Sequence, residues 1–174
     1  MLGLKRGTVK LSRHHKEWGR LFRKEKELLL SAFKNERIKI EHVGSTAIAG
    51  ISAKPIIDML MAVPSNIQKV FYKKLKELGY LDRGQQGVRG QRLFVKGSEN
   101  KRTHYLHLTG ENSKFWKEHI LFRDYLREHK IARDEYNVLK KKLAEKFANR
   151  RSLYTKAKAE FIEGIIKKAK KLRV

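Results

Sequence analysis

The apolar run "KPIIDMLMAV", residues 54–63, constrains the fold of this 174-residue chain more than any other stretch. After its first two residues, Asp58 is the only polar side chain, and such runs are typical of strands buried on both faces. A carboxylate in apolar surroundings costs several kcal/mol unless a partner stabilises its charge. That partner is either a structural base, such as Lys54 or Arg92, or a divalent metal ion bound through oxygen.

The segments on either side of this strand predict a mixture of helices and strands. Residues 15–33 have the apolar spacing of a helix, and residues 37–43 alternate as in a strand. Residues 44–50, "GSTAIAG", are expected to form a turn that opens a short helix. Ser65 is a suitable N-cap for a helix that ends at Leu78.

The second half of the chain begins with short strands and ends with helices. Residues 81–90 contain three glycines and are predicted to be a loop. Residues 91–97 and 103–110 are predicted to be neighbouring antiparallel strands, because the connection between them is brief. After Asn112 the apolar spacing predicts three helices.

Together these elements predict an α+β fold in a single domain of residues 1–174. A small mixed β-sheet flanked by helices is expected in about residues 1–110, followed by a helical C-terminal layer in about residues 112–174. No apolar run reaches the roughly 18 residues that span a bilayer, so we expect no membrane partner. The chain has no cysteine, which fits an intracellular protein, and we expect a cytoplasmic location.

The chain is strongly basic, with 42 Lys and Arg residues against 18 Asp and Glu residues and a formal net charge of +24. Residues 140–174 hold thirteen basic and only three acidic side chains. One interpretation is a solvated helical surface in a lysine-rich protein. The other is attraction for the phosphates of a nucleotide, of a phosphorylated small molecule, or of RNA bound by the basic C-terminal helices.

The sequence "GST" before the apolar strand favours phosphate binding. Gly44 lets the backbone approach a phosphate closely, and the N-terminus of the following helix offers unpaired N–H groups. The hydroxyl groups of Ser45 and Thr46 are further candidates. A Gly-Ser pair is also an ordinary hinge and N-cap, so the functional interpretation depends on Asp58, which follows in the next strand.

The order of strand, Gly-Ser, short helix and strand with an aspartate resembles the core of the nucleotidyltransferase superfamily of the DNA polymerase β type. More closely, the chain resembles the GrpB family of small nucleotidyltransferase-like proteins over almost its full length. The resemblance is carried by "GLKRGTVKL", "IEHVGSTAIAGISAKPIIDM", "GVRGQRLFVKG", "THYLHLTG", "LFRDYLREH" and "YTKAKAEFI". It implies a nucleotidyltransferase-like fold that binds a nucleoside triphosphate with Mg²⁺ or Mn²⁺ and transfers a nucleotidyl group to an acceptor.

The sequence departs from the superfamily at one important point. The superfamily has two carboxylates at alternating positions of the second strand, so that both face the metal ions. Here Ile56 and Leu60 flank Asp58 in that alternation, and neither side chain binds a metal. Two functions are therefore predicted: a metal-dependent nucleotidyltransferase, or a non-catalytic nucleotide- or RNA-binding module that retains the fold.

Other polar side chains are candidates to complete the site. Glu41 and His42 lie just before the Gly-Ser turn, and His104 and His107 lie where the superfamily has its third carboxylate. A spacing of three puts these two histidines on opposite faces of a regular strand, so we expect one of them to share a cleft with Asp58. Histidine ligands beside a carboxylate suit a transition metal better than Mg²⁺.

We therefore assign catalytic roles to Asp58, Glu41 and His107. Metal-binding roles are assigned to Asp58, Glu41, His42 and His104. Nucleotide-binding roles are assigned to Gly44, Ser45, Thr46, Lys54, Arg92 and Arg123, the last three as bases that hold phosphate. For Arg123 the alternative is a helix-surface pair with Asp124.

Overall fold

The computed structural model describes residues 2–64 and 69–172. Its elements along the chain are α1 (Lys16–Ala32), β1 (Lys39–Val43), the 3₁₀ helix η1 (Ser45–Ala47), β2 (Ile57–Val63), α2 (Lys69–Glu77), β3 (Tyr80–Asp82), β4 (Gln91–Gly97), β5 (Arg102–Gly110), α3 (Lys114–Glu128), α4 (Lys130–Lys146), α5 (Arg151–Ala157) and α6 (Ala159–Lys171). Ser65, predicted as a helix cap, lies outside the described residues. Within residues 2–64 and 69–172, no helix is long and apolar enough to cross a membrane.

The five strands form one mixed sheet in the order β1-β2-β5-β4-β3. β2 and β5 are parallel, and the other neighbouring pairs are antiparallel. Asp58 lies in β2, with Val43 of β1 on one side and Tyr105 of β5 on the other. The predicted α+β class is confirmed: a small mixed sheet is flanked by helices, and only helices follow the last strand.

One face of the sheet, called the core face, packs against α1 and α2. Alternate residues of β2 and β5 point from this face toward one apolar stripe on each helix. The core formed between them contains chiefly Trp18, Leu29, Phe33, Ile57, Met59, Met61, Phe71, Leu75, Leu106 and Leu108. Each buried side chain of this size contributes about 1.5–3 kcal/mol. This apolar face fixes the register, because a slip of one residue in β2 would turn Asp58 into the core.

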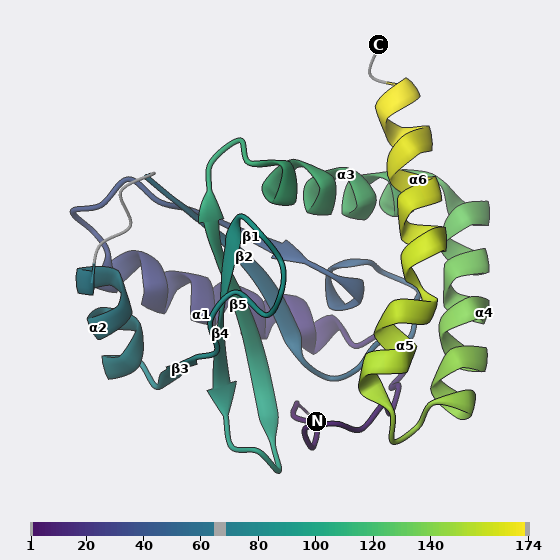
Figure 1. The fold of residues 1–174 in the computed structure, drawn as a ribbon, viewed down its shortest axis with the longest axis horizontal. Helices are drawn as coiled ribbons and strands as arrows, with labels where there is room; N and C mark the ends of the chain where they lie inside the picture. Colours follow the sequence, from purple (N-terminus) through teal and green to yellow (C-terminus); the bar gives the residue numbers. More distant parts are fainter. Residues whose placement is uncertain (1, 65–68, 173–174) are drawn as a thin grey trace.

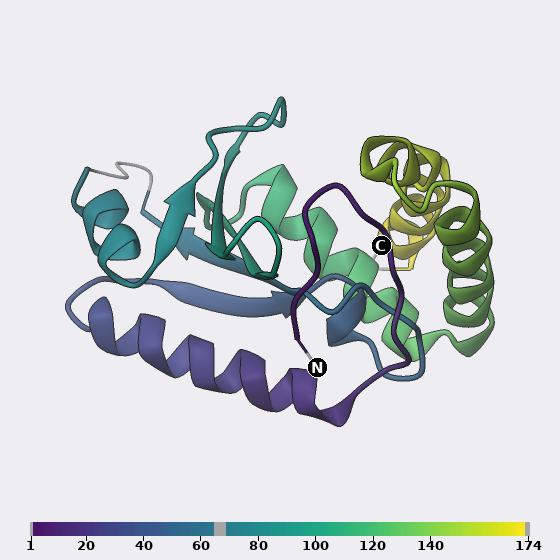
Figure 2. The same cartoon turned by 90° about the horizontal axis from the view of Figure 1, so that it is seen from below.

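The other face, called the site face, carries Glu41, Asp58, Tyr105 and His107 at neighbouring register positions. Helix α3 runs from the sheet toward α4, α5 and α6, which gather at one side of the molecule (Figure 1). The N-terminal segment loops between the sheet and these helices (Figure 2). A backbone hydrogen bond of 2.6 Å, from the N–H of Val9 to the carbonyl of Ala148, ties this segment to the connection between α4 and α5.

Two elements differ from the sequence prediction. The region predicted as a loop from residue 81 begins with strand β3, because Tyr80 is buried and donates a hydrogen bond of 2.8 Å to Glu25. Residues 113–172 form four helices rather than three, since α5 forms before α6. Helix α5 is only two turns long, which is too short for apolar periodicity to be recognised, and it is anchored by the buried Tyr154.

Candidate functional site

Asp58 lies at the second position of β2 and packs directly against the turn that follows β1. Gly44, in this turn, has a φ of 67°, in the left-handed region that favours glycine. A Cβ atom on Gly44 would lie 2.8 Å from Oδ2 of Asp58 and 3.0 Å from its Cβ. Both the backbone conformation and the close approach therefore require glycine here, and the turn holds the carboxylate in place.

Three basic side chains surround the half-buried Asp58 carboxylate: Lys54, Arg151 and Lys158. Burial raises the pKa of Asp58, and the three bases oppose this effect. Burial also lowers the pKa of Lys54 to about 7 and that of Lys158 to about 8. We call these four residues the Asp58 cluster. With one acid and three bases, it favours an anionic ligand.

The bases around Asp58 are not bonded directly to its carboxylate. Among the described residues, none forms a hydrogen bond or close ion pair with it. The three bases act on Asp58 through their charge rather than through a direct bond. The carboxylate oxygens therefore remain available to a ligand, while the neighbouring charges stabilise their ionised form.

Tyrosine side chains hold the bases of the Asp58 cluster. Arg151 donates a hydrogen bond of 2.7 Å from Nη1 to the Tyr105 hydroxyl, and its guanidinium carbon lies 4.8 Å from the ring centroid. The ammonium groups of Lys158 and Lys54 lie 4.4 Å and 5.9 Å from the ring centroid of Tyr154. These cation–π contacts orient the positive charges without neutralising them.

The two hydroxyl residues after Gly44 have different surroundings. Ser45 is half-buried and lies beside the hydroxyl of Tyr136. Burial raises the pKa of Tyr136, and the nearby Asp58 carboxylate adds a smaller effect in the same direction. Thr46 is buried, and its Oγ1 lies 3.0 Å from Nε2 of His42. The structure thus places Ser45 near Asp58, whereas the hydroxyl of Thr46 contacts His42 on the other side of the turn.

Glu41 lies on the same face as Asp58, but its carboxylate is bound to α3. Arg123 donates from Nη1 to Oε2 of Glu41 over 2.6 Å and to the carbonyl of His42 over 2.9 Å. Its Nε donates to Asp124 over 2.7 Å. Because the Arg123 side chain is only 9% exposed, this is a buried clamp between α3 and β1 rather than the simple surface pair of the alternative.

Two of the predicted histidines lie on the core face, away from Asp58. His42 is directly opposite the core residue Met59, and its ring stacks on Phe22 with 4.5 Å between the centroids. Burial lowers its pKa to about 3. His104 is opposite Ile57 and lies on the same core face. The structure does not bring either residue to the Asp58 carboxylate, because strand alternation turns both inward.

His107 is the histidine that shares the face of Asp58, as expected for one of the pair. Its ring, however, is covered by α3, with the centroid of Phe115 at 5.5 Å and that of His119 at 6.1 Å. Its Nδ1 lies 3.1 Å from Oε1 of Gln91, and burial lowers its pKa to about 3. In this conformation His107 supports the packing of α3.

Arg92 is also separated from the Asp58 cluster, because it lies in β4 and β5 runs between β4 and β2. It pairs in register with the core residue Leu108. Its guanidinium binds Asp82 through two nitrogens, at 2.6 Å and 2.9 Å to Oδ2, and lies 4.7 Å from the ring centroid of Tyr72. Of the three bases predicted to hold phosphate, only Lys54 belongs to the Asp58 cluster.

Sequence reasoning missed most of the basic residues around Asp58. Arg151 and Lys158 come from the region of α5, almost a hundred residues after Asp58 in the chain. The segment "YTKAKAEFI", which contributed to the family resemblance, contains Tyr154 and Lys158. Nothing in the sequence around Arg151 distinguishes it from its basic neighbours, because its position depends on how α5 packs.

The Asp58 carboxylate fits a metal ion only if other ligands of that ion come from a bound substrate. Within the described part of the chain, no group of three or more His, Cys, Asp or Glu side chains is placed to hold a metal ion. Asp58 offers a single carboxylate beside three bases. Mg²⁺ is commonly bound by one or two carboxylates together with substrate phosphates, so Asp58 fits a phosphate-borne metal but not a site made by protein alone.

The fold and the site define a small α+β protein with a basic site around one strand carboxylate. The GrpB protein family matches residues 8–168, and the chain belongs to this family. It is 41% identical to the glutamate-rich protein GrpB of Alkalihalophilus pseudofirmus, over 95% of this chain and 98% of that protein.

A solved structure of a GrpB protein agrees with this assignment. The crystal structure of conserved protein GrpB from Enterococcus faecalis has a TM-score of 0.85 and 34% sequence identity, over 94% of this chain and 99% of that one. A much weaker likeness, with a TM-score of 0.42 and 13% identity, is to the Cid1 poly(U) polymerase, over 66% of this chain and 42% of that one.

Proposed function

We propose that the Asp58 cluster binds a nucleoside triphosphate together with a divalent cation, Mg²⁺ or Mn²⁺. The observation that carries this proposal is the half-buried Asp58 carboxylate, which has no direct partner among the described residues and is surrounded by Lys54, Arg151 and Lys158. A carboxylate alone would repel a triphosphate. A carboxylate that shares a cation with the triphosphate, beside three bases, attracts it.

Each part of the cluster has a role in this binding. Asp58 is the protein ligand of the cation, which would neutralise phosphate charge during the reaction. Lys54, Arg151 and Lys158 contact phosphate oxygens, and the guanidinium of Arg151 has further N–H donors beyond the one bound to Tyr105. Gly44 allows the chain to pass close to the ligand, and Ser45 offers a hydroxyl beside it.

The bound nucleotide is a donor for nucleotidyl transfer to an acceptor. In such a reaction the protein contributes positioning and charge stabilisation and needs no covalent intermediate. The alternative is a non-catalytic nucleotide- or RNA-binding module, and one observation favours it. The residues that alternate with Asp58 are Ile56 and Leu60, both buried and apolar, so β2 supplies one carboxylate where two-metal catalysis uses two.

Thermal unfolding with and without ligand tests the proposal. We expect millimolar Mn²⁺ and a non-hydrolysable nucleoside triphosphate, added together, to raise the midpoint of the wild-type protein, because a ligand that binds only the folded state stabilises it. The Asp58→Asn variant should lose this shift while keeping a similar midpoint without ligand. Glu118→Gln, a surface change in α3, is the control and should keep the shift. The absence of any shift in the wild type would contradict the proposal.

A further inference from the structure

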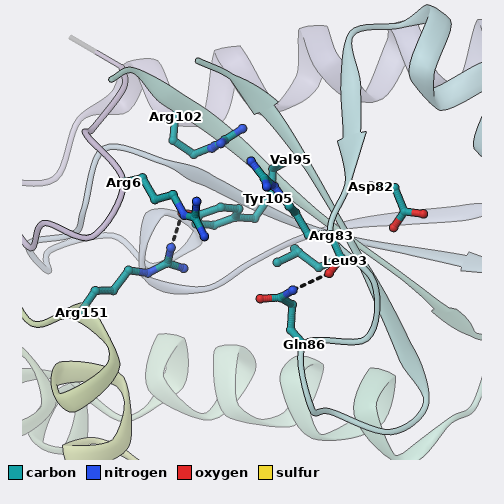
Figure 3. A pocket seen from close by; sticks show the side chains of 9 residues that line it. All are labelled: Arg6, Asp82, Arg83, Gln86, Leu93, Val95, Arg102, Tyr105 and Arg151. Atoms are coloured by element: carbon teal, nitrogen blue, oxygen red, sulfur yellow. Dashed lines mark hydrogen bonds between the residues drawn. The ribbon is translucent and has the colours of Figure 1, made fainter. Parts of the chain in front are cut away.

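A basic pocket lies next to the Asp58 cluster on the site face of the sheet. Its volume is about 340 Å³, at the lower end of the range of about 300–1,000 Å³ for small-molecule sites. Four arginines line it: Arg6 from the N-terminal segment, Arg83 from the loop after β3, Arg102 from β5 and Arg151 from α5. We call it the arginine pocket, and Figure 3 shows these side chains converging from four parts of the chain.

The pocket has an apolar floor on the sheet. Leu93 and Val95 of β4 and Tyr105 of β5 form it. Val95 and Tyr105 are buried and belong to one small hydrophobic cluster. A basic rim above an apolar floor suits a ligand that combines a phosphate with a less polar body.

The positive charge of the pocket is only partly balanced. The exposed carboxylate of Glu99 is shared by three guanidinium groups: it pairs with Arg83, with Arg6 at 3.2 Å and with Arg102 at 2.9 Å. Glu99 pairs with these arginines from outside the lining, and the acid within the lining, Asp82, is already bound by Arg92. Each guanidinium has five N–H donors, so one carboxylate leaves many of them for a ligand.

The two basic sites share a wall. Tyr105 of the pocket floor pairs in register with Asp58. Arg151, which lines the pocket, bonds to the Tyr105 hydroxyl and is also one of the three bases that act on Asp58. A ligand in the arginine pocket would therefore lie beside a nucleotide held at the Asp58 cluster.

From this arrangement we infer that the arginine pocket binds the phosphate group of a phosphate monoester, and that this monoester is the acceptor of the proposed transfer. Near pH 7 such a group carries almost two negative charges and three acceptor oxygens. Guanidinium pairs match these oxygens in a bidentate way. The binding itself stands on the pocket alone, and only the acceptor role rests on the proposed function.

A phosphate acceptor also fits the chemistry available at the site. One of its oxygens would form a bond to the α-phosphorus of the triphosphate while the bond from that phosphorus to the α–β bridging oxygen breaks. Pyrophosphate leaves with the electron pair, and the product has a new phosphate–phosphate linkage. The attacking oxygen is already deprotonated, so the step needs no general base. This is consistent with a site where the histidines are turned inward or covered by α3.

Calorimetric titration of the full chain with 5′-AMP, with adenosine as the matched ligand without phosphate, tests the inference. EDTA in the buffer removes divalent cations, so that metal-dependent binding at Asp58 does not contribute to the signal. We expect 5′-AMP to bind and adenosine not to bind. The Arg6→Gln/Arg83→Gln variant should weaken 5′-AMP binding by about tenfold or more, the effect of losing charged hydrogen bonds. The Lys73→Gln/Lys76→Gln variant removes the same charge from exposed positions of α2 and should bind as the wild type does.

Two further arms make the outcome decisive. The Lys54→Gln variant should retain 5′-AMP binding. If this variant loses binding while Arg6→Gln/Arg83→Gln retains it, the phosphate of 5′-AMP binds at the Asp58 cluster, and the inference is overturned. Equal binding of 5′-AMP and adenosine would overturn it as well. A short RNA with a 5′-phosphate, compared with its 5′-hydroxyl form, shows whether the phosphate belongs to a small molecule or to an RNA end. The proposed function is tested separately, by the thermal unfolding of the wild type and of Asp58→Asn with and without nucleotide and Mn²⁺.

Discussion

At the scale of single residues, the contact between Gly44 and Asp58 determines where the site lies. The two residues are fourteen positions apart in sequence, yet a single Cβ atom on Gly44 would collide with the carboxylate. The short turn after β1 therefore has no room for any other residue. This contact gives the "GST" sequence a physical role that does not depend on a bound phosphate.

We predict that Gly44→Ala lowers the free energy of unfolding by at least about 2 kcal/mol. The left-handed backbone alone costs roughly 1–2 kcal/mol for a residue with a side chain, and the displaced carboxylate adds to this cost. Gly87→Ala is the control, because Gly87 has a similar φ of 71° with nothing within 4 Å of the added atom. Urea denaturation of both variants measures the difference. Equal losses would show that Asp58 does not press against Gly44.

Lys140 shows that a basic run in the sequence need not face solvent. Only 1% of this residue is exposed, its ammonium donates to the carbonyl of Ser52, and it lies 4.9 Å from the ring centroid of Tyr136. Burial lowers its pKa from 10.5 to about 6. Lys140 is therefore part of the packing between α4 and the segment before β2, and not a contact for nucleic acid.

This buried lysine predicts a pH dependence of stability. Between about pH 6 and pH 10.5 the unfolded chain holds a proton on Lys140 that the folded protein lacks. Stability should therefore rise with pH in this window, by up to about 1.4 kcal/mol per pH unit from this residue. We expect Lys140→Met to reduce the slope of the rise between pH 7 and pH 9, measured by urea denaturation, while the part that comes from Lys54 and Lys158, whose pKa values are also lowered, remains. Lys141→Met, at an exposed position, should keep it; an unchanged rise in Lys140→Met would contradict the assignment.

At the scale of helices and strands, the sequence predicted most elements because alternation and helical spacing are local signals. The strands around Asp58, the antiparallel pair β4 and β5, and helix α1 all follow such signals. Alternation also placed His104 and His107 on opposite faces, as the structure shows. It did not say which face would be covered by α1 and α2, so the histidines could not be assigned to the core or the site.

The basic part of the site could not be predicted because it depends on packing between distant elements. Lys54 is close to Asp58 in sequence and was identified. Arg151 and Lys158 reach Asp58 only because α5 is held beside the sheet, partly through the N-terminal segment, where the N–H of Arg151 donates to the carbonyl of Gly7 over 3.3 Å. No local pattern in a run of Lys and Arg residues encodes such a contact.

The clamp between α3 and β1 gives a prediction that separates structural from catalytic roles for Glu41. Glu41→Gln should lower the free energy of unfolding by about 1 kcal/mol, since the Glu41 side chain is 40% exposed and Arg123 keeps its bonds to Asp124 and to the His42 carbonyl. The nucleotide-induced shift in thermal midpoint should stay as in the wild type. Glu118→Gln, at a surface pair with Lys170, is the control. Loss of the nucleotide shift with unchanged stability would make Glu41 a site residue.

At the scale of the whole molecule, the net charge of +24 is distributed over several distinct places. Part of it forms the Asp58 cluster and the arginine pocket, and part is exposed on α6, where Lys167, Lys168 and Lys171 point to solvent. The charge therefore serves more than one purpose, and the exposed lysines are the ones suited to contact an extended polyanion.

We predict weak, salt-sensitive binding of single-stranded RNA through α6. Each phosphate contact contributes a slope of about −0.7 to the logarithm of affinity against the logarithm of salt concentration. Replacing Lys167, Lys168 and Lys171 with Gln should make the slope shallower by about 2, measured by fluorescence anisotropy. The same change at Lys16, Lys24 and Lys73, which are exposed on α1 and α2, is the control. An equal effect of the two variants would assign the binding to net charge alone.

A crystal structure with Mn²⁺ and a non-hydrolysable nucleoside triphosphate would show whether Asp58 holds a nucleotide-borne metal ion. We expect an anomalous Mn²⁺ peak at roughly 2.0–2.2 Å from an oxygen of Asp58, with phosphate density between Lys54, Arg151 and Lys158. A nucleotide bound elsewhere, or no density beside Asp58 at millimolar ligand, would contradict this role of Asp58.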